Sequence, residues 1–508
     1  MPDLRVTGSN QGKVTGTPVD GAEEYTLTAD RRVKIVTTLG PAVAGIEKLV
    51  ELIAAGADMV RINAAHGSND ERTKVIEDVR KAAEIVGKPV PILFDLRGLK
   101  IRTGPLADSS PVPFARGGTV TIVAEPEPTR EGLIGINFPN LMSVIKPGSR
   151  ILIADGLIEL LVDQMHGTSA TCKISRGGIL HAKQGVTLPN APITGGSLTP
   201  EDRVDVAFAV GQGVDYLGLS FINDASDLVL AKGVAGAHGH RVPGLIAKIE
   251  RPEALNNVYD IAAHADGLMV ARGDLGVQLP PERVPRAQKH IIGTCNTLGV
   301  PVITATQMLE SMITQPMATR AETSDVANAV WDGTDAVMLS AESAVGQYPI
   351  EAVQTMARII NEAEREGPIR TKASAESLPT NGDETLAFAD SIAQAAFALA
   401  EHAPVEQILV FTLTGAAARR ITKYRPKPPI IAVTSDALTA RRLALVWGIQ
   451  TVVVPVEEDP DTMFRTAGQA IIDAGLAKAD SYSLIVGSLP MMRVAGRTNL
   501  VHIRRLGT

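Results

Sequence analysis

The sequence is poor in cysteine and in aromatic residues. Only two cysteines occur in 508 residues, Cys172 and Cys295, and they lie far apart, so no disulfide framework is expected and a reducing compartment fits. Aromatic residues make up 3% of the chain, whereas 45% of the residues are hydrophobic. The cores must therefore consist mainly of Ala, Val, Leu and Ile, as is common in proteins that alternate strands with helices.

Long apolar runs and an excess of basic residues are also absent. No stretch approaches membrane-spanning length, and the polar beginning of the chain has no apolar signal core. The formal net charge of −7 argues against a protein that binds nucleic acid by broad phosphate neutralisation. We expect a cytoplasmic protein with no membrane or nucleic-acid partner, whose residues 1–30 form a mobile leader.

What the chain does contain is a repeated alternation of short apolar runs and helix-like stretches. Eight such units precede residue 366, and eight strand–helix repeats close naturally into a TIM (β/α)8 barrel. We assign this barrel to residues 31–103 and 193–366. The strand candidates are Val33–Leu39, Met59–Ala64, Pro91–Asp95, Tyr216–Phe221, Gly244–Glu250, Gly267–Asp274, Pro301–Gln307 and Ala336–Ser340.

Two regions depart from the barrel pattern. Residues 104–192 are rich in β-branched residues and punctuated by Gly and Pro, which predicts an inserted small all-β domain, for which a small β-barrel is the expected form. A polar spacer after Gly367 precedes a second alternating pattern, which predicts a C-terminal open α/β sheet domain over residues 367–508. Its strand candidates are Gln407–Thr412, Ile430–Val433, Thr451–Pro455, Ser483–Val486 and Val501–Arg504.

Polar side chains stand at the carboxyl ends of seven of the eight barrel strand candidates. In a TIM barrel these ends meet at one mouth, where the active site lies. For any one residue a buried hydrogen bond or a rim ion pair is the simpler explanation, but seven strands together favour a site. The residues are Arg61, Asn63, Asp95, Ser220, Lys248, Glu250, Arg272, Asp274, Thr306, Ser340 and Glu342.

Two of these carboxylates, Glu250 and Asp274, favour a Mg²⁺ or Mn²⁺ site, because side by side and without a cation they would repel each other. Lys248 lies two residues before Glu250, on the same face of a strand. At 4 Å and an effective dielectric near 20, a cation contributes about 4 kcal/mol towards a phosphate charge before desolvation. The mouth therefore predicts phosphoryl-transfer chemistry. Its other cations are Arg61, Lys100 and Arg102.

Two weaker signals belong to the same mouth. At Gly273 the strand would turn into a short helix whose amide groups receive a substrate carboxylate. Thr306, in ITATQM, would be an inward hydroxyl that relays a proton through water. Each has an equally simple explanation, a common Gly-Asp turn in one case and strand packing in the other.

The chain resembles the pyruvate kinase family from about Lys34 to its C-terminus. The matching strings include KIVTTLGPA, GADMVRINAAHGS, DLRGLKIRTG, AKIERPEA, GLMVARGDLGV, TATQMLESM and the closing GRTN. The resemblance implies transfer of a phosphoryl group from phosphoenolpyruvate to ADP, which gives pyruvate and ATP in the last step of glycolysis. It also implies a homotetramer of three-domain subunits.

The resemblance assigns roles at matching positions. It implies that Lys248 contacts the phosphoryl group in flight, that Glu250 and Asp274 bind Mg²⁺, and that the Gly273 amide binds the substrate carboxylate. Thr306 resembles the threonine near the carbon that is protonated. Arg61 and Arg102 match the two phosphate-binding arginines of the family. His66 matches a nucleotide-side position and Asn63 a cation-side position.

The potassium site of the family is altered here. In potassium-dependent members, the ion is held by Asn, Ser, Asp and Thr beside a Glu in the DxKGPEIR loop. Asn63 and Asp95 match this set, but Ala65 stands for the serine, Leu96 for the threonine and Lys100 for the glutamate. We expect Lys100 to supply the charge that K⁺ would, so that K⁺ is not required.

The nucleotide side also departs from the family pattern. Glu201, in SLTPEDR, stands where LPxLSEKD has a lysine near the nucleotide phosphates, and Arg203 would point elsewhere on a helix. Asn223 replaces the arginine of SFVR, and Leu99 replaces a loop proline. These changes predict a weakened or altered nucleotide site.

A strand end in the C-terminal domain is suited to phosphate binding. Thr412, Thr414 and Gly415 precede a predicted helix, in a loop that receives a phosphorylated effector in the family, and Arg497 would close this pocket. An ordinary helix N-cap explains the same residues equally well.

Two alternative functions remain open at this point. One is a barrel lyase that uses Mg²⁺ to stabilise the enolate of a keto acid, which does not account for the inserted domain or the extra basic residues. The other is a diverged paralogue that binds phosphoenolpyruvate or an effector without turnover, which Glu201, Asn223 and Ala65 make plausible.

Overall fold

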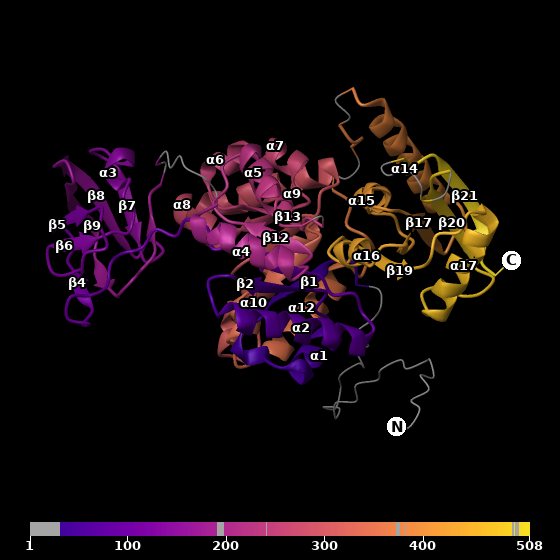
Figure 1. The fold of residues 1–508 in the computed structure, drawn as a ribbon, viewed down its shortest axis with the longest axis horizontal. Helices are drawn as coiled ribbons and strands as arrows, with labels where there is room; N and C mark the ends of the chain where they lie inside the picture. The colour runs from indigo at the N-terminus through magenta and orange to yellow at the C-terminus, as the bar shows by residue number, and fades with distance from the viewer. Residues whose placement is uncertain are drawn as a thin grey trace.

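The computed structural model describes residues 31–189, 191, 198–239, 241–371, 376–379, 382–489, 492 and 497–507. Figure 1 shows a barrel in the middle of the molecule, with a sheet domain at one end and an α/β domain at the other. The predicted leader, residues 1–30, lies outside the described residues.

Eight parallel strands close the barrel in the order β1-β16-β15-β14-β13-β12-β3-β2, which confirms the predicted TIM fold. Every residue of seven of these strands is buried, because helices cover the outside and side chains fill the inside. The strands are β1 (Lys34–Thr38), β2 (Met59–Asn63), β3 (Ile92–Asp95), β12 (Tyr216–Leu219), β13 (Gly244–Ile249), β14 (Gly267–Ala271), β15 (Val302–Ala305) and β16 (Ala336–Leu339).

Capping residues begin three of the outer helices. Ser68, Thr199 and Thr319 each accept a backbone N–H through the side chain, and an acidic side chain three residues later bonds back to the cap. Such caps contribute about 1 kcal/mol each. The barrel helices are α1 (Ile46–Ala54), α2 (Asn69–Val86), α4 (Pro200–Gly211), α5 (Ala225–Gly236), α6 (Pro252–Asn256), α7 (Val258–His264), α8 (Arg272–Gln278), α9 (Val284–Leu298), α10 (Arg320–Trp331), α11 (Ala341–Ala344) and α12 (Pro349–Ala363).

All eight barrel strands are shorter than the sequence predicted, and β14 and β15 differ most. β14 ends at Ala271, and α8 begins at the next residue, so Asp274 lies in the first turn of a helix rather than at a strand end. β15 ends at Ala305 because Thr306 and Gln307 have φ angles of +69° and +55°, which are incompatible with a strand.

Between β3 and α4 the chain forms the separate sheet domain, whose core is its own hydrophobic cluster. The strands pair as a six-stranded sheet, β11-β7-β8-β9-β5-β6, and a two-stranded sheet, β10-β4, so the small β-barrel that we expected is an arrangement of two sheets. The elements are β4 (Val112–Phe114), β5 (Thr119–Val123), β6 (Leu133–Gly135), α3 (Leu141–Val144), β7 (Arg150–Ile153), β8 (Ile158–Met165), β9 (Ser169–Arg176), β10 (Gly178–Leu180) and β11 (Val186–Thr187).

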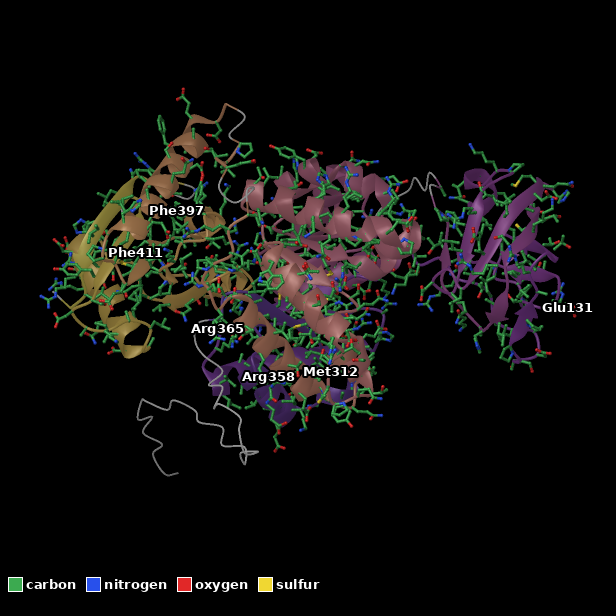
Figure 2. The ribbon with its side chains drawn as sticks, turned by 180° about the vertical axis from the view of Figure 1, so that it is seen from behind. Glu131, Met312, Arg358, Arg365, Phe397 and Phe411 are labelled. Carbon is green, nitrogen blue, oxygen red and sulfur yellow. The ribbon has the colours of Figure 1, made fainter. Side chains whose placement is uncertain are left out.

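The C-terminal domain is the predicted α/β sheet, with strand order β19-β18-β17-β20-β21 and β21 antiparallel to its neighbour. A hydrophobic cluster covers each face of this sheet. Phe397 packs against one cluster and Phe411 belongs to the other; both residues are labelled in Figure 2. The elements are α14 (Glu384–His402), β17 (Gln407–Phe411), α15 (Ala416–Lys423), β18 (Ile430–Thr434), α16 (Ala437–Leu443), β19 (Ile449–Val453), α17 (Pro460–Asp473), β20 (Tyr482–Gly487) and β21 (Leu500–Arg505).

A buried polar contact joins the barrel to the C-terminal domain. The Arg425 guanidinium lies 3.2 Å from Asp335 and 4.6 Å from the centre of the Trp447 ring. Asp335 also accepts the backbone N–H of Val302, at the start of β15. This contact ties the start of two barrel strands to the C-terminal domain.

None of the helices in the described part of the chain is long and apolar enough to cross a membrane.

Candidate active site

Lys248 lies at the centre of the barrel mouth. Its ammonium group is 2.9 Å from Ser220 Oγ, 2.9 Å from Glu250 Oε1 and 3.3 Å from Asp95 Oδ1. Burial alone would lower the pKa of Lys248, but the nearby Asp95 and Glu250 carboxylates outweigh it and raise that pKa. The lysine therefore stays charged at neutral pH, and β13 places it and Glu250 on the same side, as the two-residue spacing predicted.

Asp95, at the end of β3, connects Lys248 to Arg61. One of its oxygens lies 2.6 Å from the Arg61 guanidinium, which also donates to Thr38 Oγ1 at 3.1 Å. Burial acts to raise the pKa of Asp95, but Lys248 and Arg61 lower it overall, so the carboxylate is ionised. Asp95, which matches a potassium-site position of the family, thus orients two cations towards the mouth.

Glu250 is buried, and its two oxygens have different surroundings. Oε2 accepts the backbone N–H of Phe221 at 2.7 Å. Oε1 faces Lys248 but receives no well-directed hydrogen bond from the described residues. Burial raises the pKa of Glu250 to about 7; Lys248 opposes this shift and Asp274 adds to it. A buried carboxylate with one unsatisfied oxygen and a second carboxylate nearby is suited to a divalent cation.

The donor set matches a small, hard cation. Among the described residues, no three His, Cys, Asp or Glu side chains come together to hold a metal ion. Mg²⁺ is commonly bound by one or two carboxylates, with substrate oxygens and water as its other ligands. Glu250 and the exposed Asp274 fit this arrangement.

We predict that cation binding weakens as the pH falls below about 7. The raised pKa means that the cation-free folded protein binds a proton on Glu250 that the unfolded chain releases near pH 4.5. Protonated Glu250 therefore stabilises the cation-free folded protein against unfolding at low pH. This contribution to the free energy of unfolding is lost as the pH rises through about 7. A cation needs the ionised form, so Mn²⁺ affinity should fall up to about tenfold per pH unit below 7. Titrations with Mn²⁺ from pH 5.5 to 8 test this; constant affinity would contradict it.

The loop that carries Lys100 passes close to β12. Gly98 has a φ of +64°, and a Cβ atom there would lie 2.7 Å from Ser220 Cβ, so only glycine permits this approach. Lys100 itself is exposed at the mouth. Loss of surrounding water, and then the charge of Lys248, lower the pKa of Lys100, while Asp274 acts in the opposite direction. Lys100 thus lies within electrostatic reach of the Lys248 cluster.

Thr306 and Gly273 form the other side of the mouth. The Gly273 amide donates to Thr306 Oγ1 at 2.8 Å, and the hydroxyl donates to the carbonyl of Ala305 at 2.6 Å. The amide that we expected to receive a substrate carboxylate is therefore bonded to Thr306 here. The two residues meet beside a cavity of about 580 Å³, whose lining includes Gly273, Asp274 and, from the sheet domain, Asp155.

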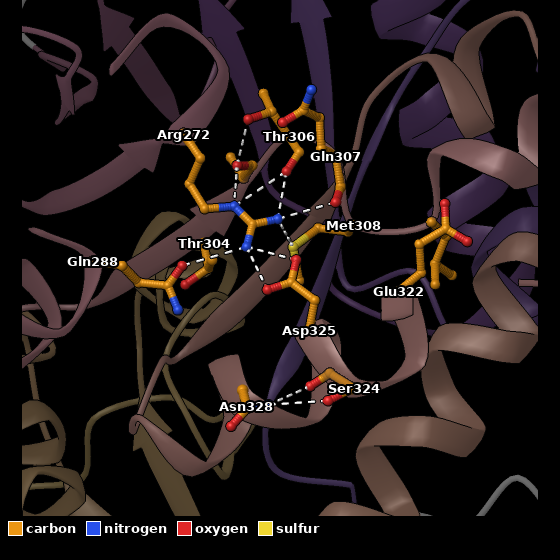
Figure 3. Close-up of polar contacts among 12 residues, drawn as sticks. Arg272, Gln288, Thr304, Thr306, Gln307, Met308, Glu322, Ser324, Asp325 and Asn328 are labelled. Carbon is orange, nitrogen blue, oxygen red and sulfur yellow. Dashed lines mark hydrogen bonds and ion pairs between the residues drawn. The ribbon is translucent and has the colours of Figure 1, made fainter. Parts of the chain in front are cut away.

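Arg272 holds the strained backbone around Thr306. Its guanidinium donates to the carbonyls of Thr306 at 2.6 Å and Gln307 at 3.2 Å, and lies 2.7 Å from Asp325 (Figure 3). A positive φ is unfavourable for a β-branched residue, so these contacts are needed to keep Thr306 in place.

The structure does not bring every predicted residue into this cluster. Arg102 donates to the carbonyl of Lys183 at 3.2 Å, and Asn63 Oδ1 accepts the amide of Ala65 at 3.0 Å. His66 is exposed beyond the end of β2. The altered nucleotide-side residues are also peripheral: Glu201 and Arg203 are exposed on α4, and Leu99 packs against the core of the sheet domain.

The proposed effector loop has a local structural explanation. Thr412 Oγ1 accepts the amide of Gly415, whose φ of +82° begins α15. Thr414 and Arg497 are exposed. Gly415 is the N-cap residue of α15 and Thr412 holds the turn before it, whereas effector binding stays a prediction.

Sequence reasoning missed three residues of the site and, besides Arg272, included a second structural residue. Thr38, at the end of β1, follows the strand-end rule that found the others, whereas the Phe221 amide and the pairing of Arg251 with Asn223 give no such signal. Glu342 is a structural residue, because its carboxylate accepts the amides of Ser340 and Leu309.

Comparisons with known proteins agree with this geometry. Residues 30–353 match the family described as pyruvate kinase, barrel domain, and residues 390–504 match pyruvate kinase, alpha/beta domain. The chain is 41% identical over 476 residues to a pyruvate kinase of Geobacillus stearothermophilus, covering 93% of this chain and 80% of that protein. It is 39% identical over 483 residues to a pyruvate kinase of Agrobacterium vitis, covering 95% and 100%. The structure of a pyruvate kinase from Cryptosporidium parvum superposes with a TM-score of 0.86 at 32% identity, covering 94% of this chain and 96% of that one. The chain belongs to the pyruvate kinase family.

Proposed function

We propose that this chain transfers a phosphoryl group from phosphoenolpyruvate to ADP, with Mg²⁺ and without K⁺, through the residues of the barrel mouth. Membership of the family supports the reaction itself. The observation that carries the assignment of residues is Lys248, a buried cation held between Asp95 and Glu250 at the carboxyl ends of the strands.

The residues have separate tasks in the reaction. The bond between phosphorus and the enol oxygen breaks, and a bond forms to a phosphate oxygen of ADP. Lys248 and Arg61 stabilise the negative charge on the group in transfer because Asp95 already orients both of them. The enolate that remains takes a proton on carbon, which the Thr306 hydroxyl would relay through water. Glu250 and Asp274 would hold the divalent cation, which neutralises charge on the substrate oxygens.

Pyruvate production that depends on ADP is the decisive experiment. A barrel lyase acting through an enolate would form its product without a nucleotide, and a binding paralogue would form no pyruvate at all. A coupled pyruvate assay with a panel of nucleoside diphosphates separates these alternatives. It also tests the altered nucleotide site that we propose from Glu201, since normal ADP saturation would rule that proposal out.

We expect initial rates without K⁺ to stay within tenfold of those with K⁺. Lys100 lies within electrostatic reach of Lys248 and Asp274, where its charge can replace that of a monovalent cation. Rates measured at matched ionic strength, with K⁺ replaced by a quaternary ammonium salt, provide the check. A drop of more than tenfold would refute the proposal.

Three further proposals rest on family membership rather than on a contact in this chain. They are assembly as a homotetramer, a cytoplasmic location, and regulation by a phosphorylated effector at Thr412, Thr414, Gly415 and Arg497. Size-exclusion chromatography with light scattering tests the first of them directly.

A further inference from the structure

The loop after β12 contacts the Glu250 carboxylate, and the backbone of this loop has an unfavourable conformation at Phe221. Phe221 has a φ of +54°, and its N–H donates to Glu250 Oε2 at 2.7 Å. A bulky residue rarely adopts this φ, so contacts elsewhere in the loop must keep it there. The orientation of Glu250 therefore depends on what holds this loop.

Asn223 is the point at which the loop is held. Its side-chain oxygen accepts a hydrogen bond from the Arg251 guanidinium at 2.9 Å, and its carbonyl accepts one from the Asn257 side chain at 3.0 Å. Its N–H donates to Asp227 Oδ2 at 2.7 Å. Arg251 is only 7% exposed, so its position is well restrained.

We propose that Arg251 and Asn223 form a positioning pair that fixes Glu250 for the divalent cation. Arg251 directly follows Glu250 in the chain, and its hydrogen bond to Asn223 closes a ring that returns through Phe221 to the Glu250 carboxylate. The ring determines where Oε1, the unsatisfied oxygen, points. The inference relies on the proposed function only for the nature of the cation.

The pair involves one of the positions at which this chain departs from the family pattern. The SFVR string would carry an arginine at position 223, whereas here the guanidinium comes from position 251 and the amide lies at 223. Asn223 therefore has a local structural role in this chain, in addition to its place in the altered nucleotide-side pattern with Glu201 and Leu99.

Mn²⁺ binding measured by electron paramagnetic resonance tests the pair in Arg251→Gln and Asn223→Ala. Both variants should bind Mn²⁺ at least tenfold more weakly than the unmodified protein. The kcat of Arg251→Gln at saturating Mg²⁺ should stay within threefold, because the Arg251 side chain is assigned to neither substrate nor cation. Arg358→Gln is the matched control: that arginine is exposed on α12 (Figure 2) and donates to Thr355, and its loss should leave Mn²⁺ affinity unchanged.

The transposed variant Asn223→Arg/Arg251→Asn provides the decisive comparison. It should bind Mn²⁺ within threefold of the unmodified protein, whereas Asn223→Arg alone, which places two guanidinium groups together, should not. Unchanged affinity in the first two variants, or a transposed variant that is unfolded or no better than they are, overturns the proposal. The readout needs no turnover, so a protein that binds Mn²⁺ but makes no pyruvate contradicts the proposed function and leaves the positioning pair intact.

Discussion

Pyruvate formation by the Lys248→Met variant should be at least about a hundredfold slower in kcat than that of the unmodified enzyme. Electrostatic groups placed in advance at a site of developing charge typically contribute about 3 kcal/mol or more to catalysis. Lys248 is such a group, because Asp95, Glu250 and Ser220 fix its ammonium before any substrate arrives. Methionine has a similar length and fills the space without a charge.

The same substitution removes the cation that separates two buried carboxylates. Without Lys248, Asp95 and Glu250 lose the charge that opposes the effect of burial, so the pKa of each should rise. The variant should therefore be less stable at pH 8 than at pH 6, and thermal unfolding at both pH values separates this effect from the loss of rate. Lys48→Met is the control, since Lys48 lies exposed on α1 and pairs with the equally exposed Glu51. Near-normal turnover in Lys248→Met would remove the basis of the proposed mechanism.

The core of the candidate site could be predicted because barrel geometry places strand ends together. Arg61, Asp95 and Lys248 come from three different strands, and closure of the barrel brings their side chains to one point. The period of two along β13 places Glu250 beside Lys248. These relations depend only on strand order and side-chain alternation, both of which are legible in a sequence.

What could not be predicted depends on backbone conformations that no periodic pattern encodes. Asp274 reaches the mouth from a helix rather than from a strand end, and Phe221 presents its amide only because its φ is positive. The strand-end rule also cannot separate a functional carboxylate from a structural one. Glu342 satisfies the rule, yet both of its oxygens accept backbone amides, whereas Oε1 of Glu250 faces the Lys248 ammonium.

The Lys100→Gln variant should lose at least about a hundredfold in activity, and added K⁺ should not restore it. Lys100 is a positive charge within electrostatic reach of Lys248 and Asp274, and removing one group that stabilises developing negative charge typically costs about 3 kcal/mol. K⁺ cannot take its place, because Ala65 and Leu96 offer no side-chain oxygen. Lys74→Gln, an exposed lysine on α2 that pairs with Asp78, is the matched control.

A triple variant, Ala65→Ser/Leu96→Thr/Lys100→Glu, tests the converse. It supplies the oxygen ligands and the negative charge of the potassium-dependent pattern next to Asn63 and Asp95, so its rate should rise at least tenfold when K⁺ is added. Leu96 is buried, and a melting temperature measured for each variant shows whether the threonine is tolerated. Two results would disprove the assignment: Lys100→Gln with full activity in K⁺-free buffer, or a folded triple variant that does not respond to K⁺. Either would mean that Lys100 is a surface lysine, and that the charge balance of the mouth is set by Arg61, Lys248 and the divalent cation alone.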